Sequence, residues 1–227
     1  GTITSTVSVN QKAGFSIVSY TGTGANATVG HGLGAEPSVV IVKARGTPNG
    51  LARSWFVYTK SVGPTKTLYL NETTAAATTS GPWNDTAPTS SVFSLGNEPS
   101  VNWASNAYIA YCFAEVEGFS KFGSYTGNGS TDGPFVYCGF RPAFVMIKAT
   151  SAAGYNWTIE DAERSPFNAS DKLLYPSTSS AENSGTARND FLSNGFKARD
   201  SGNNNVSGVT YIFAAFADQP VKFNNAR

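Results

Sequence analysis

A tryptophan in a polar stretch is the residue best suited to chemistry in this 227-residue sequence. The stretch runs from Asn71 to Ser91, and within it Trp83 directly precedes Asn84 and Asp85. An exposed indole ring can stack on a sugar while neighbouring amide and carboxylate groups bind the sugar hydroxyls. Trp103 lies beside another loop and could add a second stacking surface. These four residues are the predicted ligand-binding site; the alternative is that the tryptophans pack their loops against the core.

Residue patterns for catalysis are weak. Glu160 and Glu163 are neighbouring carboxylates, as are Glu115 and Glu117. Glycosidases use pairs of carboxylates, but neither pair recurs in the other half of the chain, and neighbouring acids are common on protein surfaces. His31 is the only histidine, and the chain lacks the Gly-x-Ser-x-Gly turn that would present a serine nucleophile. We therefore expect a protein that is not an enzyme.

Cofactor and metal motifs are incomplete. The segments 22–24 and 127–129 share two glycines with the nucleotide-binding pattern, but they lack its third glycine and its following helix. Asn128 and Asp132 flank a glycine-rich turn and could offer oxygen ligands to calcium, although an Asx turn explains them more simply. The two cysteines have no zinc-type spacing. We expect neither a cofactor nor a bound metal.

Composition restricts the partners. Lys and Arg total 16 and Asp and Glu total 15, so the net charge is +1, and the basic residues are scattered. Nucleic-acid binding needs several converging cations, so we expect no nucleic-acid partner. No apolar run approaches the roughly 18 residues of a membrane-spanning helix, so we expect no membrane insertion. The 14% of charged and 13% of aromatic residues favour an all-β protein with a neutral, polar surface.

The chain repeats itself, and the repeated elements must position any site. Residues 20–43 match residues 125–148 without a gap. Further matches are Trp55 with Trp157, Leu68 with Leu173, and residues 108–115 with residues 211–218. Two copies of this length predict an all-β chain of two tandem, internally duplicated β-sandwich-like units, residues 1–116 and 117–227. The linker between them is short, so we expect the units to pack together.

Runs of β-branched and alternating apolar residues locate the strands. The expected strands are 14–20, 39–43, 54–58, 66–70, 91–95 and 107–115, then 119–125, 135–140, 143–149, 156–160, 172–175, 190–192, 195–199 and 209–217. Residues 39–43 are apolar on both faces and should be central. Residues 1–13 form either an edge strand or a lead-in from an upstream domain. Residues 161–170 and 180–188 tolerate helix.

The same alignment separates shared residues from unmatched ones. Cys138 aligns with Leu33 and Cys112 with an alanine, so a disulfide is not part of the repeated unit and we expect two buried free thiols. The stretch that corresponds to the Trp83 loop, residues 176–189, contains no aromatic residue. One copy of a duplicated domain can diverge while the other remains a scaffold, so the unmatched aromatic marks the expected binding loop.

Three phrases of the sequence carry a family resemblance. They are TVSVNQKAGFSIVSYTGTGANATVGHGLG, YIAYCFAEVEGFSKFGSYTGNGSTDGPFVYCGFRP and DFLSNGFK. Over essentially its whole length the chain resembles a domain of unassigned function found in tail and other virion proteins of bacteriophages. The resemblance implies a C-terminal module of a larger structural protein, which agrees with the start without Met, and it carries over no site residue. The chain departs from the family at VNWASNAY, where Asn-x-Ser-Gly is usual, so a turn glycine is missing.

The leading hypothesis is a bacteriophage virion surface module, on a tail fibre or spike, that serves host attachment without catalysis. Its expected partners are other virion proteins and a host cell-surface polysaccharide. Its expected form is a homo-oligomer, a trimer by analogy with attachment proteins, made in the host bacterial cytoplasm and resident in the virion. The alternative is a purely structural head decoration or fibre-assembly domain. A polysaccharide-degrading tailspike is the least favoured hypothesis, because no acid pair recurs.

Overall fold

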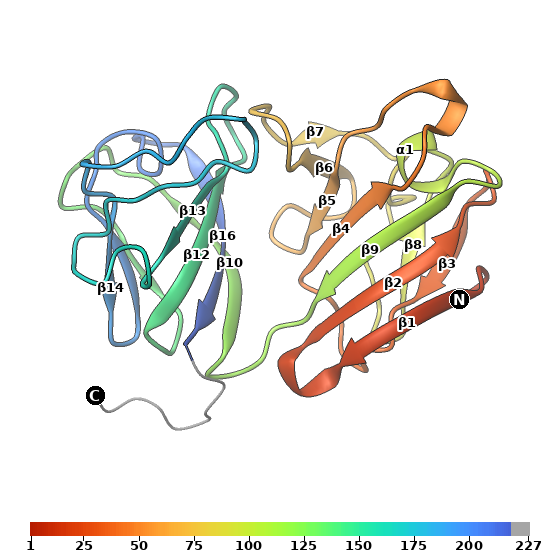
Figure 1. Cartoon of the computed structure of the whole chain (residues 1–227), viewed down its shortest axis with the longest axis horizontal. Coiled ribbons are helices and arrows are strands. Elements are labelled where there is room, and N and C mark those ends of the chain that lie inside the picture. Colours follow the sequence, from red (N-terminus) through yellow and green to blue (C-terminus); the bar gives the residue numbers. More distant parts are fainter. Residues whose placement is uncertain (219–227) are drawn as a thin grey trace. The chain divides into compact units, whose positions relative to one another are not determined.

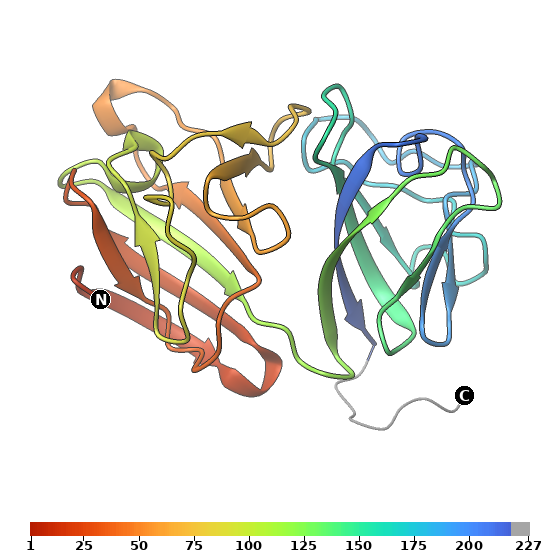
Figure 2. The same cartoon turned by 180° about the vertical axis from the view of Figure 1, so that it is seen from behind.

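The computed structural model describes residues 1–218 and divides the chain into two compact units (Figures 1 and 2). The first unit consists of Gly1–Leu70 and Ala76–Glu115, and the second of Asn71–Ala75 and Val116–Arg227. The boundary expected between residues 116 and 117 lies one residue from this division, which also assigns residues 71–75 to the second unit. The chain is all-β, with several antiparallel sheets.

The first unit is built from a large and a small antiparallel sheet. The large sheet has the order β1 (Ser5–Asn10), β2 (Phe15–Thr21), β9 (Ala107–Phe113), β4 (Val39–Ala44), β5 (Phe56–Thr59), β6 (Lys66–Tyr69) and β7 (Ala77–Thr78). The small sheet pairs β3 (Ala27–Gly30) with β8 (Val92–Leu95). Three short helical turns connect strands: η1 (Gln11–Ala13), η2 (Pro48–Gly50) and α1 (Pro99–Asn102).

The second unit repeats this plan with fewer strands. Its larger sheet has the order β10 (Ser120–Thr126), β16 (Thr210–Ala217), β12 (Pro142–Ala149) and β13 (Thr158–Asp161). Its smaller sheet has the order β11 (Phe135–Tyr137), β15 (Gly195–Ala198) and β14 (Asn189–Leu192). Each unit buries its own hydrophobic core, to which both of its sheets contribute side chains.

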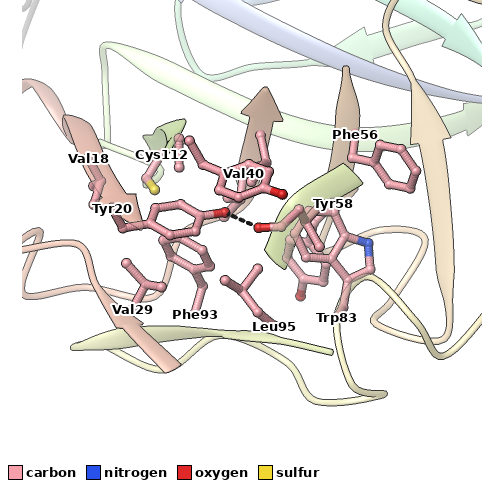
Figure 3. Close-up of a cluster of buried hydrophobic side chains, with 14 of the residues drawn as sticks. Val18, Tyr20, Val29, Val40, Phe56, Tyr58, Trp83, Phe93, Leu95 and Cys112 are labelled. Atoms are coloured by element: carbon pink, nitrogen blue, oxygen red, sulfur yellow. Dashed lines mark hydrogen bonds between the residues drawn. The ribbon is translucent and has the colours of Figure 1, made fainter. Parts of the chain in front are cut away.

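The first core shows why these segments become strands. Val40 of β4 points inward from the centre of the large sheet, and Val29 and Leu95 face it from the small sheet (Figure 3). Val42 of β4 belongs to the same core. All four side chains are fully buried. Burying each such side chain contributes roughly 1.5–3 kcal/mol relative to leaving it in water. Residues 39–43 were predicted to be central, and β4 does lie between β9 and β5.

The duplication is confirmed by strand register. The order β2-β9-β4-β5 corresponds to β10-β16-β12-β13. Tyr20 pairs with Tyr108 in the first unit, and Tyr125 pairs with Tyr211 in the second. The predicted equivalence of residues 39–43 and 144–148 therefore holds. Trp55 and Trp157 each lie one residue before the strand that pairs with β4 or β12, as their match predicted.

Three predicted matches are wrong because connecting loops differ in length. They are the gapless match of residues 20–43 with 125–148, the match of Cys138 with Leu33, and the match of Leu68 with Leu173. In the small sheets, Val29 pairs with Phe93 and Val136 pairs with Phe196. Val29 is therefore the counterpart of Val136. Counted between matched strand residues, the loop before β11 is two residues longer than the loop before β3, and the loop before β12 is two residues shorter than the loop before β4. Cys138 therefore does not match Leu33. Leu68 pairs with Val57, and Leu174 bridges Ile159, so register matches Leu68 to the residue after Leu173.

Other expectations divide between confirmed and wrong. Residues 1–13 contain the edge strand β1, and both cysteines are buried and free, as predicted. Residues 161–170 and 180–188 form turns and bridges without helix, because no apolar stripe is available to pack a helix against the sheets. Residues 172–175 make only isolated bridges, and strand β3 and helix α1 were not expected.

Candidate functional site

A stacked pair of tyrosines fixes the loops at one end of the first unit. The rings of Tyr20 and Tyr108 lie 5.3 Å apart and are tilted by only 15°. The Tyr20 hydroxyl donates to the carbonyl oxygen of Val101 at 2.7 Å (Figure 3), and the backbone N–H of Trp103 donates to the Tyr108 hydroxyl at 2.7 Å. Burial raises the pKa of both tyrosines, so both hydroxyls stay protonated. The backbone of Trp103 is therefore held by the core.

A buried asparagine joins this pair to the neighbouring loop. The Asn102 side chain donates from Nδ2 to the carbonyl oxygens of Ala25, at 2.6 Å, and Gly96, at 2.8 Å. Its Oδ1 accepts from the backbone N–H of Thr23 at 2.8 Å. One amide thus binds three backbone groups, and removing it would leave all three unsatisfied, at about 1–3 kcal/mol for each buried group. The loop at residues 22–26 has a fixed position beside Trp103.

The second unit contains the same arrangement. Tyr125 and Tyr211 stack at 5.2 Å and 15°. Asn205 donates from Nδ2 to the carbonyl oxygens of Ser130, at 2.7 Å, and Asp200, at 2.9 Å, and its Oδ1 accepts from the backbone N–H of Asn128. Because both copies retain this arrangement, the Tyr-Thr-Gly phrases are part of the duplicated scaffold.

Close backbone contact explains the first glycine of each phrase. A Cβ on Gly22 would lie 2.3 Å from the carbonyl oxygen of Trp103, and a Cβ on Gly127 would lie 2.3 Å from that of Val206. No real Cβ tolerates such a distance. The pairing also shows that Trp103 and Val206 are equivalent, since the Val206 N–H donates to the Tyr211 hydroxyl as the Trp103 N–H donates to that of Tyr108.

Trp83, the centre of the predicted site, is not exposed. Its side chain is 2% exposed and belongs to the first core, where its ring lies 5.9 Å from that of Tyr58 in an edge-to-face arrangement (Figure 3). The prediction that it presents a stacking surface is therefore wrong. The loop turns back at residues 81–83, so the indole enters the apolar gap between the sheets, where burial is worth more than solvent exposure. Trp83 pins the loop to the core, the alternative that the sequence left open.

The other three predicted residues do lie at the surface. Asn84 and Asp85 are exposed and adopt left-handed backbone conformations, with φ of 51° and 46°. The Asn84 Oδ1 accepts from the Asn26 side chain at 2.7 Å, and the carbonyl of Ala25, next to Asn26, accepts from Asn102. Trp103 is 37% exposed.

The loop at residues 22–26 consequently lies between Asn84 on one side and Asn102 with Trp103 on the other. We call the exposed groups of Asn26, Asn84, Asp85 and Trp103 the loop surface. It offers amides, a carboxylate and part of an indole ring on a backbone held by buried bonds. This combination suits hydrogen bonding to hydroxyl groups with one apolar contact.

At the strand position where the first unit has Tyr58, packed against Trp83, the second unit has a buried carboxylate, Glu160. Glu160 is 1% exposed, its Oε2 accepts from the Ser170 hydroxyl at 2.6 Å, and its Oε1 accepts from the Asn189 amide at 2.6 Å. An ion pair between Arg188 and Asp200, at 2.7 Å, is buried beside it. Burial raises the pKa of Glu160 to about 7, while the Ser170 and Asn189 hydrogen bonds oppose that rise.

This carboxyl group cannot serve as half of a glycosidase pair. The sequence treated Glu160 as one of several neighbouring surface acids, and the structure corrects this, since its side chain is buried and both carboxyl oxygens accept from buried side chains. Glu163 lies in the turn two residues after the end of β13, and hydrolysis would need both carboxyls at a substrate. Glu160 instead satisfies the side-chain amides that line the second core.

His31 is also a structural residue. It is fully buried, its Nδ1 accepts from the backbone N–H of Leu33 at 3.2 Å, and its Nε2 lies 3.2 Å from the carbonyl oxygen of Thr89. These partners fit a neutral ring that is protonated on Nε2. Burial lowers the pKa of His31, so the neutral form is favoured. The side chain ties two loops together, and the sequence, which expected a loop histidine without chemistry, did not show this burial.

Sequence reasoning missed the most exposed aromatic pair on a strand. Phe135 and Tyr137 of β11 are 46% and 63% exposed and point to the same side of the small sheet, whereas Val136 between them enters the core. Their counterparts in the first unit are Thr28 and Gly30. The signal was available, because an alternation of Phe, Val and Tyr in a predicted strand places two aromatics on one face.

Among residues 1–218, no group of three His, Cys, Asp or Glu side chains is placed to hold a metal ion. None of the helices in that part of the chain is long and apolar enough to span a membrane.

The fold and the loop surface define an all-β, internally duplicated domain whose exposed features are loop amides and a few aromatic rings. Comparison with protein families places it further. A family model described as a domain of unknown function, DUF7483, matches residues 1–220, and the chain belongs to this family. Searches of curated proteins and of solved structures gave no match.

Proposed function

We propose that this domain is a non-catalytic surface module of a bacteriophage virion, carried by a tail fibre or spike, and that its loop surface binds a host cell-surface polysaccharide. The phage assignment rests on the sequence resemblance described above. The binding assignment rests on the geometry of the loops in the first unit. The expected partners are the host polysaccharide and other virion proteins, and the expected assembly is a homo-oligomer, a trimer by analogy.

One observation carries the binding proposal: Trp103 keeps 37% of its surface exposed although its backbone is fixed by the buried Tyr108 hydroxyl. A rigid backbone lowers the entropy cost of presenting an aromatic ring to a ligand. The equivalent position in the second unit carries Val206, so the scaffold does not require an aromatic residue there. The exposed amides of Asn26 and Asn84 lie across the same loop.

The affinity of one such surface should be low. A single partly exposed ring with two or three hydrogen bonds supports a dissociation constant on the order of millimolar. Display of several copies on one particle would raise the avidity by a factor of roughly 100 or more, which is how weak sites become useful for adsorption. This is why the proposal includes an oligomer.

The test uses the purified chain coupled at high density to beads, exposed to a panel of purified bacterial capsules and lipopolysaccharide O-chains. The proposal predicts retention of at least one polysaccharide and its release by soluble fragments of the same polymer. Beads with a single chain each should bind far more weakly. Failure of densely coupled beads to retain any polymer or any intact bacterial cell would contradict the proposal.

A purely structural role, in head decoration or fibre assembly, is the second candidate. The exposed strand β11 favours it, because an uncovered sheet edge and two exposed aromatic rings suit contact with another protein. The two roles are compatible, since the loop surface belongs to the first unit and β11 to the second.

A further inference from the structure

The outer edge of β11 is open. The backbone N–H of Ala198 donates to the carbonyl oxygen of Pro134, and that of Cys138 donates to Asn194, so even-numbered residues of this segment face β15. In an antiparallel pair the alternate residues face the other way. The N–H and C=O groups of Phe135 and Tyr137 therefore point away from β15, and no residue in the range 1–218 bonds to them.

The equivalent edge of the first unit is covered. Thr28 and Gly30 of β3 are the counterparts of Phe135 and Tyr137. The carbonyl oxygen of Thr28 accepts from the backbone N–H of Ile3 at 3.0 Å, and the Thr28 N–H donates to the Thr2 hydroxyl at 2.8 Å. The carbonyl oxygen of Gly30 accepts from the Ser5 hydroxyl at 3.0 Å. The amino-terminal segment thus satisfies three of the four outward backbone groups of Thr28 and Gly30 before it continues into β1 beside β3 (Figure 1).

The covering segment also completes the core. Ile3 runs parallel to β3, opposite Val29, and its side chain is 6% exposed within the first core. Tyr20, in the same core, is 3% exposed. In the second unit, Tyr125 occupies the Tyr20 position but is only partly buried. Among residues 1–218, no residue bridges β11 as Ile3 bridges β3.

The opposite edge of the same small sheet, along β14, is closed, so β11 is the open edge of this sheet. At that edge the Asn168 side chain imitates a strand: its Nδ2 donates to the carbonyl oxygen of Phe191 at 3.1 Å, and its Oδ1 accepts from the Phe191 N–H at 2.9 Å. Ser170 bridges Asn189 further along β14. Proteins usually protect sheet edges in this way, because an open edge pairs with other chains.

We propose that the β11 edge is a docking site for an extended segment of another polypeptide, which lies parallel to β11 as residues 2–5 lie along β3. The segment carries a β-branched apolar residue, in the position of Ile3, flanked by Ser or Thr. The apolar side chain covers Tyr125 and Val136, and the flanking backbone binds the outward groups of Phe135 and Tyr137. This is strand addition to a sheet edge, a recurrent mode of protein recognition.

Within residues 1–218 no segment bonds to this edge, and we take the occupant to be a segment of another chain. The connection from β9 to β10 consists of residues 114–119, which continue directly from one large sheet to the next and leave no length for a second edge strand. The chain's own Thr2–Ser5 segment is engaged in the first unit, where exchange would expose Ile3. Another polypeptide with such a segment is the partner that this site fits, whatever the loop surface binds.

The test titrates a synthetic peptide with the sequence of residues 1–10, GTITSTVSVN, into the 15N-labelled full chain. Backbone amide shifts are read at peptide concentrations up to several millimolar, because a short strand pairing is weak. We expect saturable shifts at the amides of Phe135, Val136 and Tyr137. A peptide in which aspartate replaces the isoleucine should give no shift, because a charge cannot enter the core edge.

Two pairs of variants isolate the backbone contribution. Tyr137→Pro removes an outward N–H without touching the β15 ladder, and Tyr137→Ala removes the same ring but keeps that N–H. Phe135→Pro and Phe135→Ala form a second pair, in case one proline disturbs the strand. We expect at least tenfold weaker binding for each proline variant than for its alanine partner, with the β14 and β15 amide shifts unchanged.

Four outcomes would overturn the proposal. The first is the absence of shifts at β11 with the original peptide, and the second is equal binding by the proline and alanine variants. The third is shifts confined to the β3 amides, which would show exchange with the chain's own amino-terminal segment. Tighter peptide binding by a chain shortened to end at Asp218 would assign the edge to the chain's last nine residues and would also contradict a partner chain.

Discussion

Trp83 and Asn189 occupy equivalent positions in the two units. The backbone N–H of Gly96 donates to the carbonyl oxygen of the residue before Trp83, as that of Arg199 donates to the residue before Asn189. Trp83 packs against Tyr58, whereas Asn189 donates to Glu160, which stands at the Tyr58 position. The duplicated scaffold therefore accommodates an aromatic pair in one copy and an amide-carboxyl pair in the other.

Replacing Trp83 by alanine should destabilise the first unit. The side chain is fully buried, and removing a buried tryptophan or phenylalanine costs about 3–5 kcal/mol. Thermal unfolding should show a lowered Tm, and hydrogen exchange should accelerate at amides of β3, β8 and β4. An unchanged Tm would contradict the burial of this indole and would return it to the list of candidate binding residues.

Glu160 should make the second unit less stable as the pH rises. Its folded-state pKa of about 7 exceeds the ordinary 4.5, so the folded state retains a proton that the unfolded state releases. The stability should fall between about pH 4.5 and pH 7, by roughly 3 kcal/mol.

The matched variant is Glu160→Gln, which keeps the acceptor for Asn189 and cannot ionise. Chemical denaturation at pH 4.5 and pH 8 should show a smaller pH dependence for the variant and a higher stability than the original chain at pH 8. A variant with the same pH dependence as the original chain would show that Glu160 is not the group that titrates.

His31 should titrate below its ordinary pKa of 6.5, because burial disfavours the charged ring. The first unit should therefore lose stability as the pH falls below about 6.5, the opposite direction to the Glu160 effect. As the only histidine, His31 gives unambiguous ring signals in an NMR titration. A midpoint at or above 6.5 would contradict the buried, neutral ring.

Ser105 and Gly208 form a matched pair for a backbone test. Both have left-handed conformations, with φ of 62° and 75°, and donate to the carbonyl oxygens of Gly22 and Gly127 respectively. A residue with a Cβ pays about 1 kcal/mol or more in this region. Ser105→Gly should therefore stabilise the chain by about 1 kcal/mol, and Gly208→Ser should destabilise it similarly, as measured by denaturant midpoints. The same sign for both substitutions would refute the equivalence.

The sequence predicted the duplication and the central strands because both depend on local apolar runs. Val39–Val42 is β-branched throughout and can only be a strand buried on both faces. The sequence also identified the Tyr-Thr-Gly phrases as turns. It could not show that Asn102 and Asn205 bind three backbone groups each, because two of the three partners of each asparagine lie at least 75 residues away along the chain.

The candidate site was predicted less well because exposure depends on tertiary packing. Trp83 lies among polar residues, but its loop turns inward at a gap that Tyr58 and Leu95 leave between the sheets. Glu160 looked like a surface acid because its partners, Ser170 and Asn189, are distant in sequence. Trp103 was correctly placed at the surface, for which its neighbouring turn residues were sufficient evidence.

The most direct test of the proposed function replaces Trp103 by valine, the residue that the second unit carries at this position. The backbone bond to the Tyr108 hydroxyl is kept, so the Tm should not change. The account predicts roughly tenfold weaker binding of the densely coupled variant to its polysaccharide, and unchanged binding for Val206→Ala, the control in the second unit. Polysaccharide binding by Trp103→Val equal to that of the original chain, at equal Tm, would contradict the account.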